Sequence, residues 1–141
     1  MTLCGRVASV AVAALCAAGV GAAPVAAADV VGFTSPSGNV GCILTEDMVR
    51  CDIADRSWAP PPRTADCPDF TDYGQGLTLG RTGAPRFVCA GDTALGAGPA
   101  LPYGEDRAGA GISCRSEMSG MRCLNTDGRG FTLSREDYTV F

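Results

Sequence analysis

Cysteine is the residue type in this chain with the widest range of possible chemistry. A thiolate can act as a nucleophile, bind a metal or exchange with a disulfide, and two cysteines can form a covalent crosslink. Two of the eight cysteines, Cys4 and Cys16, precede the segment that we expect to fold. The remaining candidates are Cys42, Cys51, Cys67, Cys89, Cys114 and Cys123.

Four of these cysteines form two pairs with the same spacing. Eight residues separate Cys42 from Cys51 and Cys114 from Cys123, and an arginine precedes the second cysteine of each pair. In an antiparallel hairpin this spacing sets the two cysteines opposite each other, with Cα atoms about 4.5 to 5.5 Å apart, where a disulfide can form. We therefore predict both hairpin disulfides, which leaves the other two cysteines to pair with each other.

Histidine is absent from the chain, which removes the usual general base and the commonest metal ligand. If the cysteines are in disulfides, thiolate catalysis and zinc binding by sulfur are removed as well. We therefore predict a noncatalytic protein without a cofactor or metal. The remaining enzymatic alternative is a pair of carboxylates that hydrolyses a glycosidic bond. The pool for such a pair is Glu46, Asp47, Asp52, Asp55, Asp92, Glu105 and Asp106.

Two polar segments carry the oxygen atoms that calcium accepts. The first contains Asp66, Asp69 and Asp72, and the second is Asn-Thr-Asp-Gly at residues 125–128. Neither has the residue order of an EF-hand loop. Solvated turns are therefore the preferred interpretation, and a weak calcium site is the alternative.

The most unusual local sequence is Trp-Ala-Pro-Pro-Pro-Arg at residues 58–63. Consecutive prolines favour a stiff polyproline II segment, which can bind an aromatic groove or face a protease as an inhibitory loop. The alternative is a connector whose tryptophan packs on the edge of a sheet. The possible binding surface consists of Trp58, Pro60, Pro61, Pro62 and Arg63.

The N-terminal residues predict export. Arg6 is followed by an apolar run at residues 7–20 and by three alanines before Asp29, which is the pattern of a cleaved signal peptide over residues 1–28. Lipid modification of Cys16 is disfavoured, because a large residue, Leu15, precedes it. We expect a secreted protein, extracellular or in the cell envelope, with no integral membrane segment after cleavage and a single disulfide-bonded domain at residues 29–141.

The charge of the chain restricts its partners. The formal net charge is −4, and all eleven basic residues are arginines that form no basic run. Counterion release therefore cannot drive nucleic-acid binding, and we exclude that class. We expect a monomer whose partner is an unidentified protein or a cell-envelope ligand.

Short strands are the elements that must position these residues. Apolar and polar residues alternate at 49–53, which predicts a half-buried strand paired with residues 40–44. Residues 112–116 and 121–123 repeat this arrangement, with Gly120 closing the turn at positive φ. Further strands are expected at 76–79, 86–89 and 130–133. The predicted fold class is all-β: a small disulfide-stapled antiparallel sheet, or a barrel, with the two cysteine hairpins as related halves.

Several longer motifs resemble those of a known family. They include Ser-Pro-Ser-Gly-Asn-x-Gly-Cys at residues 35–42, the aromatic and proline residues at 58–62, and Gly-Phe-x-Leu-Ser-Arg-x-x-Tyr-x-x-Phe at 130–141. The chain resembles small secreted actinobacterial proteins, of the mycobacterial type, that are classed as a domain of unknown function. The resemblance implies export, one disulfide-bonded domain and no established activity. We therefore expect a noncatalytic binding domain, with an inhibitor of an extracellular hydrolase as the alternative and a carboxylate-based hydrolase as a lesser one.

Overall fold

The computed structural model describes residues 19, 21–24 and 29–141. The predicted signal peptide, with Cys4 and Cys16, falls almost entirely outside these residues, and the prediction of its cleavage stays a prediction. Within the described residues, no helix is long and apolar enough to cross a membrane.

Ten β-strands and no helix form the described part of the chain. Residues 31–89 contribute β1 (Val31–Thr34), β2 (Val40–Leu44), β3 (Met48–Ile53), β4 (Tyr73–Gly80) and β5 (Arg86–Cys89). Residues 106–140 contribute β6 (Asp106–Gly109), β7 (Ile112–Glu117), β8 (Gly120–Leu124), β9 (Gly130–Leu133) and β10 (Tyr138–Val140).

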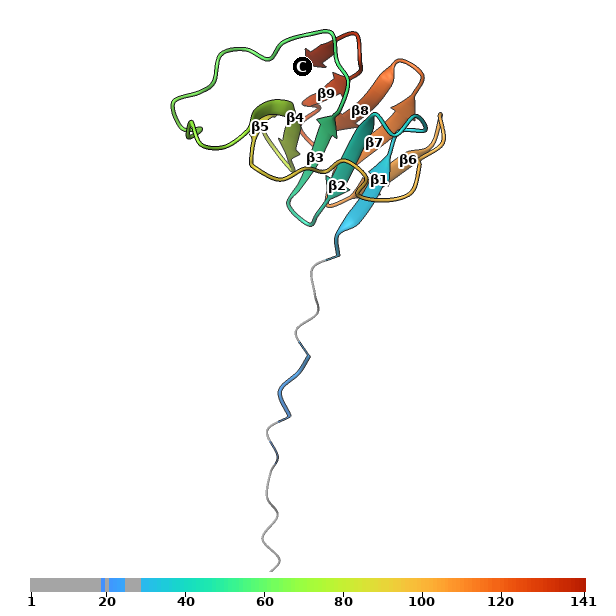
Figure 1. The fold of residues 1–141 in the computed structure, drawn as a ribbon. Coiled ribbons are helices and arrows are strands. Elements are labelled where there is room, and N and C mark those ends of the chain that lie inside the picture. Colours follow the sequence, from blue (N-terminus) through green and yellow to red (C-terminus); the bar gives the residue numbers. More distant parts are fainter. Residues whose placement is uncertain (1–18, 20, 25–28) are drawn as a thin grey trace, which may run out of the picture.

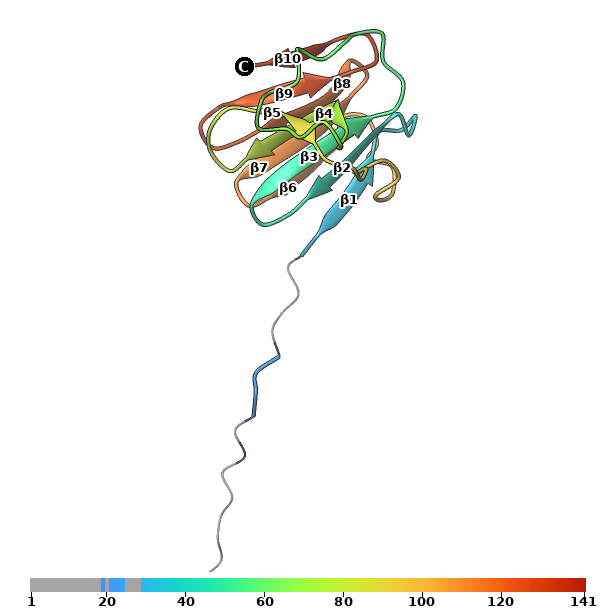
Figure 2. The same ribbon diagram turned by 60° about the vertical axis from the view of Figure 1, so that its left-hand side comes forward.

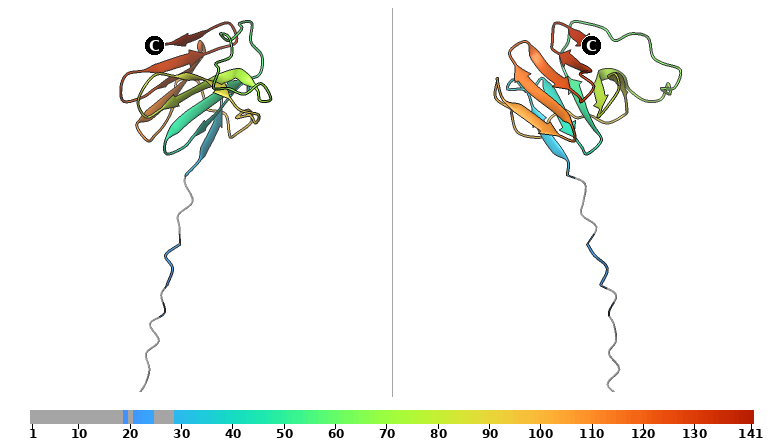
Figure 3. Two further views of the ribbon diagram at one scale, coloured as in Figure 1. Left: turned by 90° about the vertical axis from the view of Figure 1, so that its left-hand side faces the viewer. Right: turned by 180° about the vertical axis from the view of Figure 1, so that it is seen from behind.

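The strands form two antiparallel meanders, one from each half of the chain. The first sheet has the order β1-β2-β3-β4-β5 and the second has the order β10-β9-β8-β7-β6. The two sheets face each other, as Figures 2 and 3 show. The predicted all-β, disulfide-stapled antiparallel fold is confirmed, but the strands divide into two sheets rather than the single sheet or barrel that we expected. Each cysteine hairpin has one apolar face, and each sheet buries that face against the other.

Both cysteine hairpins have the predicted register. Cys42 is opposite Cys51, and Cys114 is opposite Cys123. The Cα atoms of each pair are 4.1 Å apart, and both pairs are disulfide-bonded. The Sγ atoms of Cys51 and Cys123 are 4.0 Å apart, so the two disulfides meet between the sheets.

Apolar side chains from both sheets surround the paired disulfides. Inward-facing residues alternate with outward-facing ones along the central strands, as the sequence pattern predicted. The buried core comprises Phe33, Val40, Leu44, Val49, Ile53, Leu77, Leu79, Leu101, Ile112, Met121, Phe131 and Leu133 together with the four hairpin cysteines. The two hairpins thus supply matching halves of one core.

The connection from β5 to β6 crosses the outer face of the first sheet. β5 lies at one edge of the sandwich and β6 lies at the other, so the connection between them must cross a sheet face. Gly41 on β2 permits the crossing: a Cβ atom there would lie 2.3 Å from the carbonyl oxygen of Ala94. At the far edge, the amide of Leu101 donates to the carbonyl oxygen of Thr34. The outer face of the first sheet is therefore covered by backbone.

The two arginines that precede the second cysteine of each hairpin point outward from equivalent positions. Arg50 lies under the β5–β6 connection, where its guanidinium binds the carboxylates of Asp52 and Asp92. Arg122 lies on the outer face of the second sheet, with its guanidinium carbon 4.5 Å from the ring centroid of Phe141. The two equivalent arginines therefore hold different segments of the chain: Arg50 holds the β5–β6 connection and Arg122 holds the C-terminal residue.

Candidate functional site

The segment that joins β3 to β4 projects from the body of the sandwich (Figure 1). We call residues 57–72 the proline loop, and Figure 1 shows it extending away from both sheets. A disulfide between Cys67 and Cys89 attaches it to β5, with Cα atoms 5.8 Å apart. At its start, the amide of Ser57 donates to the carbonyl oxygen of Arg135, 2.8 Å away. The third disulfide is the pairing that remained after the two hairpins, and it anchors a loop rather than a strand pair.

A row of aromatic rings supports the base of the proline loop. The ring centroid of Tyr138 is 4.7 Å from that of Trp58 and 5.1 Å from that of Phe87, which in turn lies 6.2 Å from Tyr73. The indole Nε1 of Trp58 donates to the carbonyl oxygen of Ser134, 2.9 Å away. Because Phe87 is on β5 and Tyr138 on β10, the row closes the seam between the two sheets. Trp58 therefore packs on a sheet edge, as the connector interpretation predicts.

The prolines continue from this base toward the tip. Pro60 packs against Gly74, where a Cβ atom would lie 2.4 Å from the proline ring. Pro61, Pro62 and Tyr73 line a groove of about 560 Å³, and the Tyr73 hydroxyl donates to the carbonyl oxygen of Pro62 at 3.4 Å. The guanidinium of Arg63 lies over the Tyr73 ring, 5.5 Å from its centroid. Of the five residues in the predicted binding surface, the structure brings Pro61 and Pro62 together at the groove and uses the others to hold the loop.

Phe70 is the exposed feature of this loop that sequence reasoning missed. Its side chain is 92 % exposed. It occupies a β-turn closed by a 3.2 Å hydrogen bond from the amide of Thr71 to the carbonyl oxygen of Pro68. The exposed residues Asp69 and Asp72 flank it. The available signal was a phenylalanine two positions after a proline, in a segment without the apolar and polar alternation that marks a buried strand face.

The predicted carboxylate pool is dispersed over the molecule, and several of its members are held by arginines. Asp52 is buried and accepts two hydrogen bonds from Arg50 at 2.9 and 2.7 Å. The hydrogen bond from Arg50, and then its charge, lower the pKa of Asp92. The hydrogen bond from Arg115 lowers the pKa of Asp106 in the same way. A general acid needs a raised pKa, so Asp92 and Asp106 are unsuited to that role.

One member of each candidate calcium segment, Asp66 and Asn125, uses its side-chain oxygen atoms within the protein. A hydrogen bond from the Thr64 hydroxyl is the largest cause of a lowered pKa at Asp66, which also forms a 2.9 Å ion pair with Arg86. Asn125 donates from its side chain to the carbonyl oxygens of Gly80 and Gly83 and accepts from two amides of its own turn. This second segment therefore joins the β8–β9 turn to the β4–β5 turn.

Three core sulfur atoms lie close enough together to suggest a metal site. The Sγ atoms of Cys51, Cys114 and Cys123 lie within 4.8 Å of one another. All three belong to disulfides, which have no thiolate to offer a metal. Their proximity is explained by the contact between the two hairpin crosslinks.

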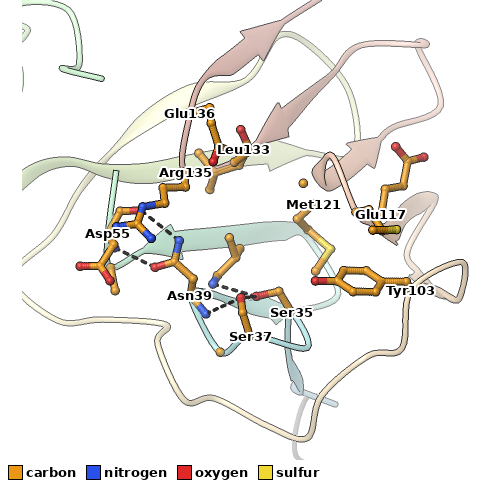
Figure 4. Close-up of a pocket in the computed structure, with 16 residues that line it drawn as sticks. Ser35, Ser37, Asn39, Asp55, Tyr103, Glu117, Met121, Leu133, Arg135 and Glu136 are labelled. Atoms are coloured by element: carbon orange, nitrogen blue, oxygen red, sulfur yellow. Dashed lines mark hydrogen bonds between the residues drawn. The ribbon is translucent and has the colours of Figure 1, made fainter. Parts of the chain in front are cut away.

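A separate cavity lies between the turns at one end of the sandwich, and Figure 4 shows it. This end cavity has a volume of about 520 Å³, an apolar floor that includes Met121 and Leu133, and a polar rim. Asn39 on the rim is already engaged, because its side-chain amide exchanges two hydrogen bonds with the backbone of Asp55. The carboxylates that line the cavity are those of Asp55, Glu117 and Glu136, of which only Asp55 belongs to the predicted pool.

Together, the fold and the proline loop define a small disulfide-stabilised β-sandwich domain with one anchored, projecting loop. The chain belongs to a family of unknown function, DUF6636, which it matches over residues 11–141. No curated protein and no solved structure matches the chain. The family agrees with the predicted class of uncharacterised domain and assigns no activity.

Proposed function

We propose that this protein is an exported, noncatalytic binding domain that recognises a protein partner through the proline loop. The observation that carries the proposal is Phe70, which is 92 % exposed in a turn of the proline loop, three positions after the cysteine that anchors the loop to β5. Aromatic side chains are frequent hot spots in protein interfaces, and presentation on a rigid segment reduces the conformational entropy that binding costs. Export is supported by the signal-like N-terminus and by three disulfides, which persist in oxidising compartments.

The charges near Phe70 favour a partner with a basic surface. Asp69 and Asp72, one position before and two positions after Phe70 in the sequence, are exposed, and the whole chain is acidic. A complementary surface has an apolar pocket for the phenyl ring and basic residues around its rim. The same two carboxylates oppose insertion of Phe70 into an anionic membrane.

Site-specific crosslinking tests this proposal. A photoreactive phenylalanine analogue is placed at Phe70, and a matched control carries it at Met118, which is 88 % exposed near the end cavity. With the envelope and culture fractions of the source organism, we expect one protein adduct from position 70 that excess wild-type protein competes away. Phe70→Ala should compete at least about tenfold less well, as expected for removal of a hot spot. Equal competition by Phe70→Ala, or the same adduct from position 118, would exclude the loop as the recognition element.

Inhibition of an extracellular hydrolase is the second candidate function. It is favoured by the shape of the proline loop, which is convex and held by the Cys67–Cys89 disulfide as inhibitory loops commonly are. If the crosslinked partner is a hydrolase, wild-type protein should lower its activity and Phe70→Ala should do so about tenfold less effectively. Unchanged hydrolase activity in the complex would leave binding without inhibition.

The noncatalytic part of the proposal has its own test at the end cavity. Purified protein is offered glycan and peptide substrates, and we expect no turnover. Turnover that is lost on Glu117→Gln or Glu136→Gln would contradict the noncatalytic assignment and support the carboxylate-based hydrolase.

A further inference from the structure

The Cys67–Cys89 disulfide differs from the other two in its access to solvent. The four cysteines of the hairpin disulfides are completely buried between the sheets. Cys89, by contrast, is exposed on β5 and lines the groove beside the proline loop. A thiolate must reach a sulfur atom directly in order to exchange with a disulfide. In the folded protein, the disulfide of the proline loop is therefore the one that an external thiol can attack.

A guanidinium group lies beside the other sulfur of this disulfide. Nη1 of Arg63 is 3.2 Å from Sγ of Cys67 and also donates to the carbonyl oxygen of Pro68 at 2.8 Å. The nearest acidic side chain in sequence, Asp66, is paired with Arg86. A fixed cation stabilises a thiolate, and a more stable thiolate leaves faster in disulfide exchange. Its exposure makes Cys89 the sulfur that is attacked, and the neighbouring Arg63 makes Cys67 the sulfur that leaves.

We propose that Cys67–Cys89 is a thiol-exchange site for low-molecular-weight thiols. The external thiolate attacks Sγ of Cys89 and forms a new sulfur–sulfur bond, while the Cys67–Cys89 bond breaks and its electron pair goes to Sγ of Cys67. The product is a mixed disulfide on Cys89 and a thiolate on Cys67 beside Arg63. A second external thiolate attacks the external sulfur of the mixed disulfide, which releases Cys89 as a thiolate and leaves the two external molecules joined as a disulfide.

Exchange at this site changes how the proline loop is held. The covalent link from Cys67 to β5 is lost, and hydrogen bonds such as that from the amide of Ala90 to the carbonyl oxygen of Asp72 remain. The sandwich keeps its two buried disulfides and its core. Reduction therefore releases the turn that carries Phe70 without unfolding the domain, and the effect on partner binding rests on the function proposed above.

Timed alkylation of the oxidised protein tests the proposal. The protein is incubated with graded concentrations of reduced glutathione at neutral pH, quenched with acid, alkylated and mapped by mass spectrometry. We expect Cys67 and Cys89 to be modified at least about tenfold faster than the four core cysteines, with the first glutathione adduct on Cys89. Modification of all six at one rate, or a first adduct on Cys67, would overturn the proposal.

Variants of Arg63 separate thiolate stabilisation from simple anchoring of the loop. Arg63→Gln should slow exchange by about threefold or more, while Arg63→Lys keeps most of the rate. Arg86→Gln is the matched control, because it removes the ion pair with Asp66 without touching a sulfur atom, and it should not slow exchange. Faster exchange in Arg63→Gln would mean that this arginine only holds the loop and would overturn its proposed role. Phe70→Ala should exchange like the wild type, so failure of exchange and failure of partner recognition are distinguishable.

Discussion

Asp52→Ala is the substitution whose cost follows most directly from the structure. Asp52 is buried on the outer face of the first sheet, and both of its carboxylate oxygens accept hydrogen bonds from Arg50. Its Oδ2 also accepts from the amide of Ala94 at 2.9 Å, which fixes the β5–β6 connection on the sheet. The alanine variant leaves Arg50 with Asp92 as its carboxylate partner and deprives the Ala94 amide of its acceptor.

The expected loss of stability is about 3 kcal/mol. Removal of one partner from a buried ion pair costs about 3 to 5 kcal/mol, and the low end applies because Arg50 retains Asp92. The matched control is Asp106→Ala. Arg115 binds Asp106 with the same two distances, 2.9 and 2.7 Å, but the two side chains are 50 % and 44 % exposed rather than 14 % and 1 %. Because water solvates this second pair, the control should change stability little.

Guanidinium unfolding with intact disulfides measures both variants, and the fluorescence of the single tryptophan, Trp58, reports the transition. A loss of about 3 kcal/mol corresponds to a fall in Tm of roughly 10 to 15 °C for a domain of this size. The double variant Arg50→Met, Asp52→Ala should be more stable than Asp52→Ala alone, because no charge is left poorly paired. Equal losses for Asp52→Ala and Asp106→Ala would refute the reasoning that burial, rather than contact geometry, determines the cost.

Three further predictions concern the crossing backbone, acid stability and the base of the proline loop. Gly41→Ala should cost about 1 to 3 kcal/mol in urea unfolding, because its Cβ atom would lie 2.3 Å from the Ala94 carbonyl oxygen. Gly91→Ala is the control and should be nearly neutral, because its Cβ atom would meet nothing nearer than 3.5 Å. Arg50 holds the pKa of Asp92 below its usual value of 3.8, so the stability that this ion pair contributes is present above pH 3.8 and is lost as the pH falls through the lower folded pKa. The acid unfolding curve of Asp92→Asn should lack this component. An acid unfolding curve like that of the wild type would contradict the assignment. Trp58→Phe removes the hydrogen bond to the Ser134 carbonyl oxygen and should lower the free energy of unfolding by about 1 kcal/mol. Thermal unfolding followed by circular dichroism measures this loss, and an unchanged Tm would show that the hydrogen bond makes no net contribution to stability.

Alternation was strongest in the central strands, and those were predicted best. The β2–β3 hairpin has the register deduced from Cys42 and Cys51, and β5 and β9 have the predicted bounds. The short edge strands β1, β6 and β10 were not predicted. These strands have only three or four residues, and β6 (Asp-Arg-Ala-Gly) has no large apolar side chain to mark a buried face. In β6, Arg107 even faces the same side of the sheet as Cys114.

The candidate site was less accessible to prediction than the fold. Residues 58–63 drew attention through their composition, yet Trp58 serves the base of the loop and the exposed residue is Phe70. Composition reports which side chains are unusual in a segment, whereas exposure depends on what the rest of the chain places beside them. The ring of Tyr138, far along the sequence, decides that Trp58 is covered.

The sequence by itself determined the all-β class and the pairing of the four hairpin cysteines. Both follow from local geometry, because alternation and an eight-residue spacing constrain residues that are near one another in the chain. Only the tertiary structure decided that the hairpins face each other, that their disulfides meet at 4.0 Å, and that the third disulfide tethers an exposed loop beside Arg63. These relations depend on burial of two apolar sheet faces against each other and on a connection that must cross one sheet to reach the other, and neither is encoded in any single segment.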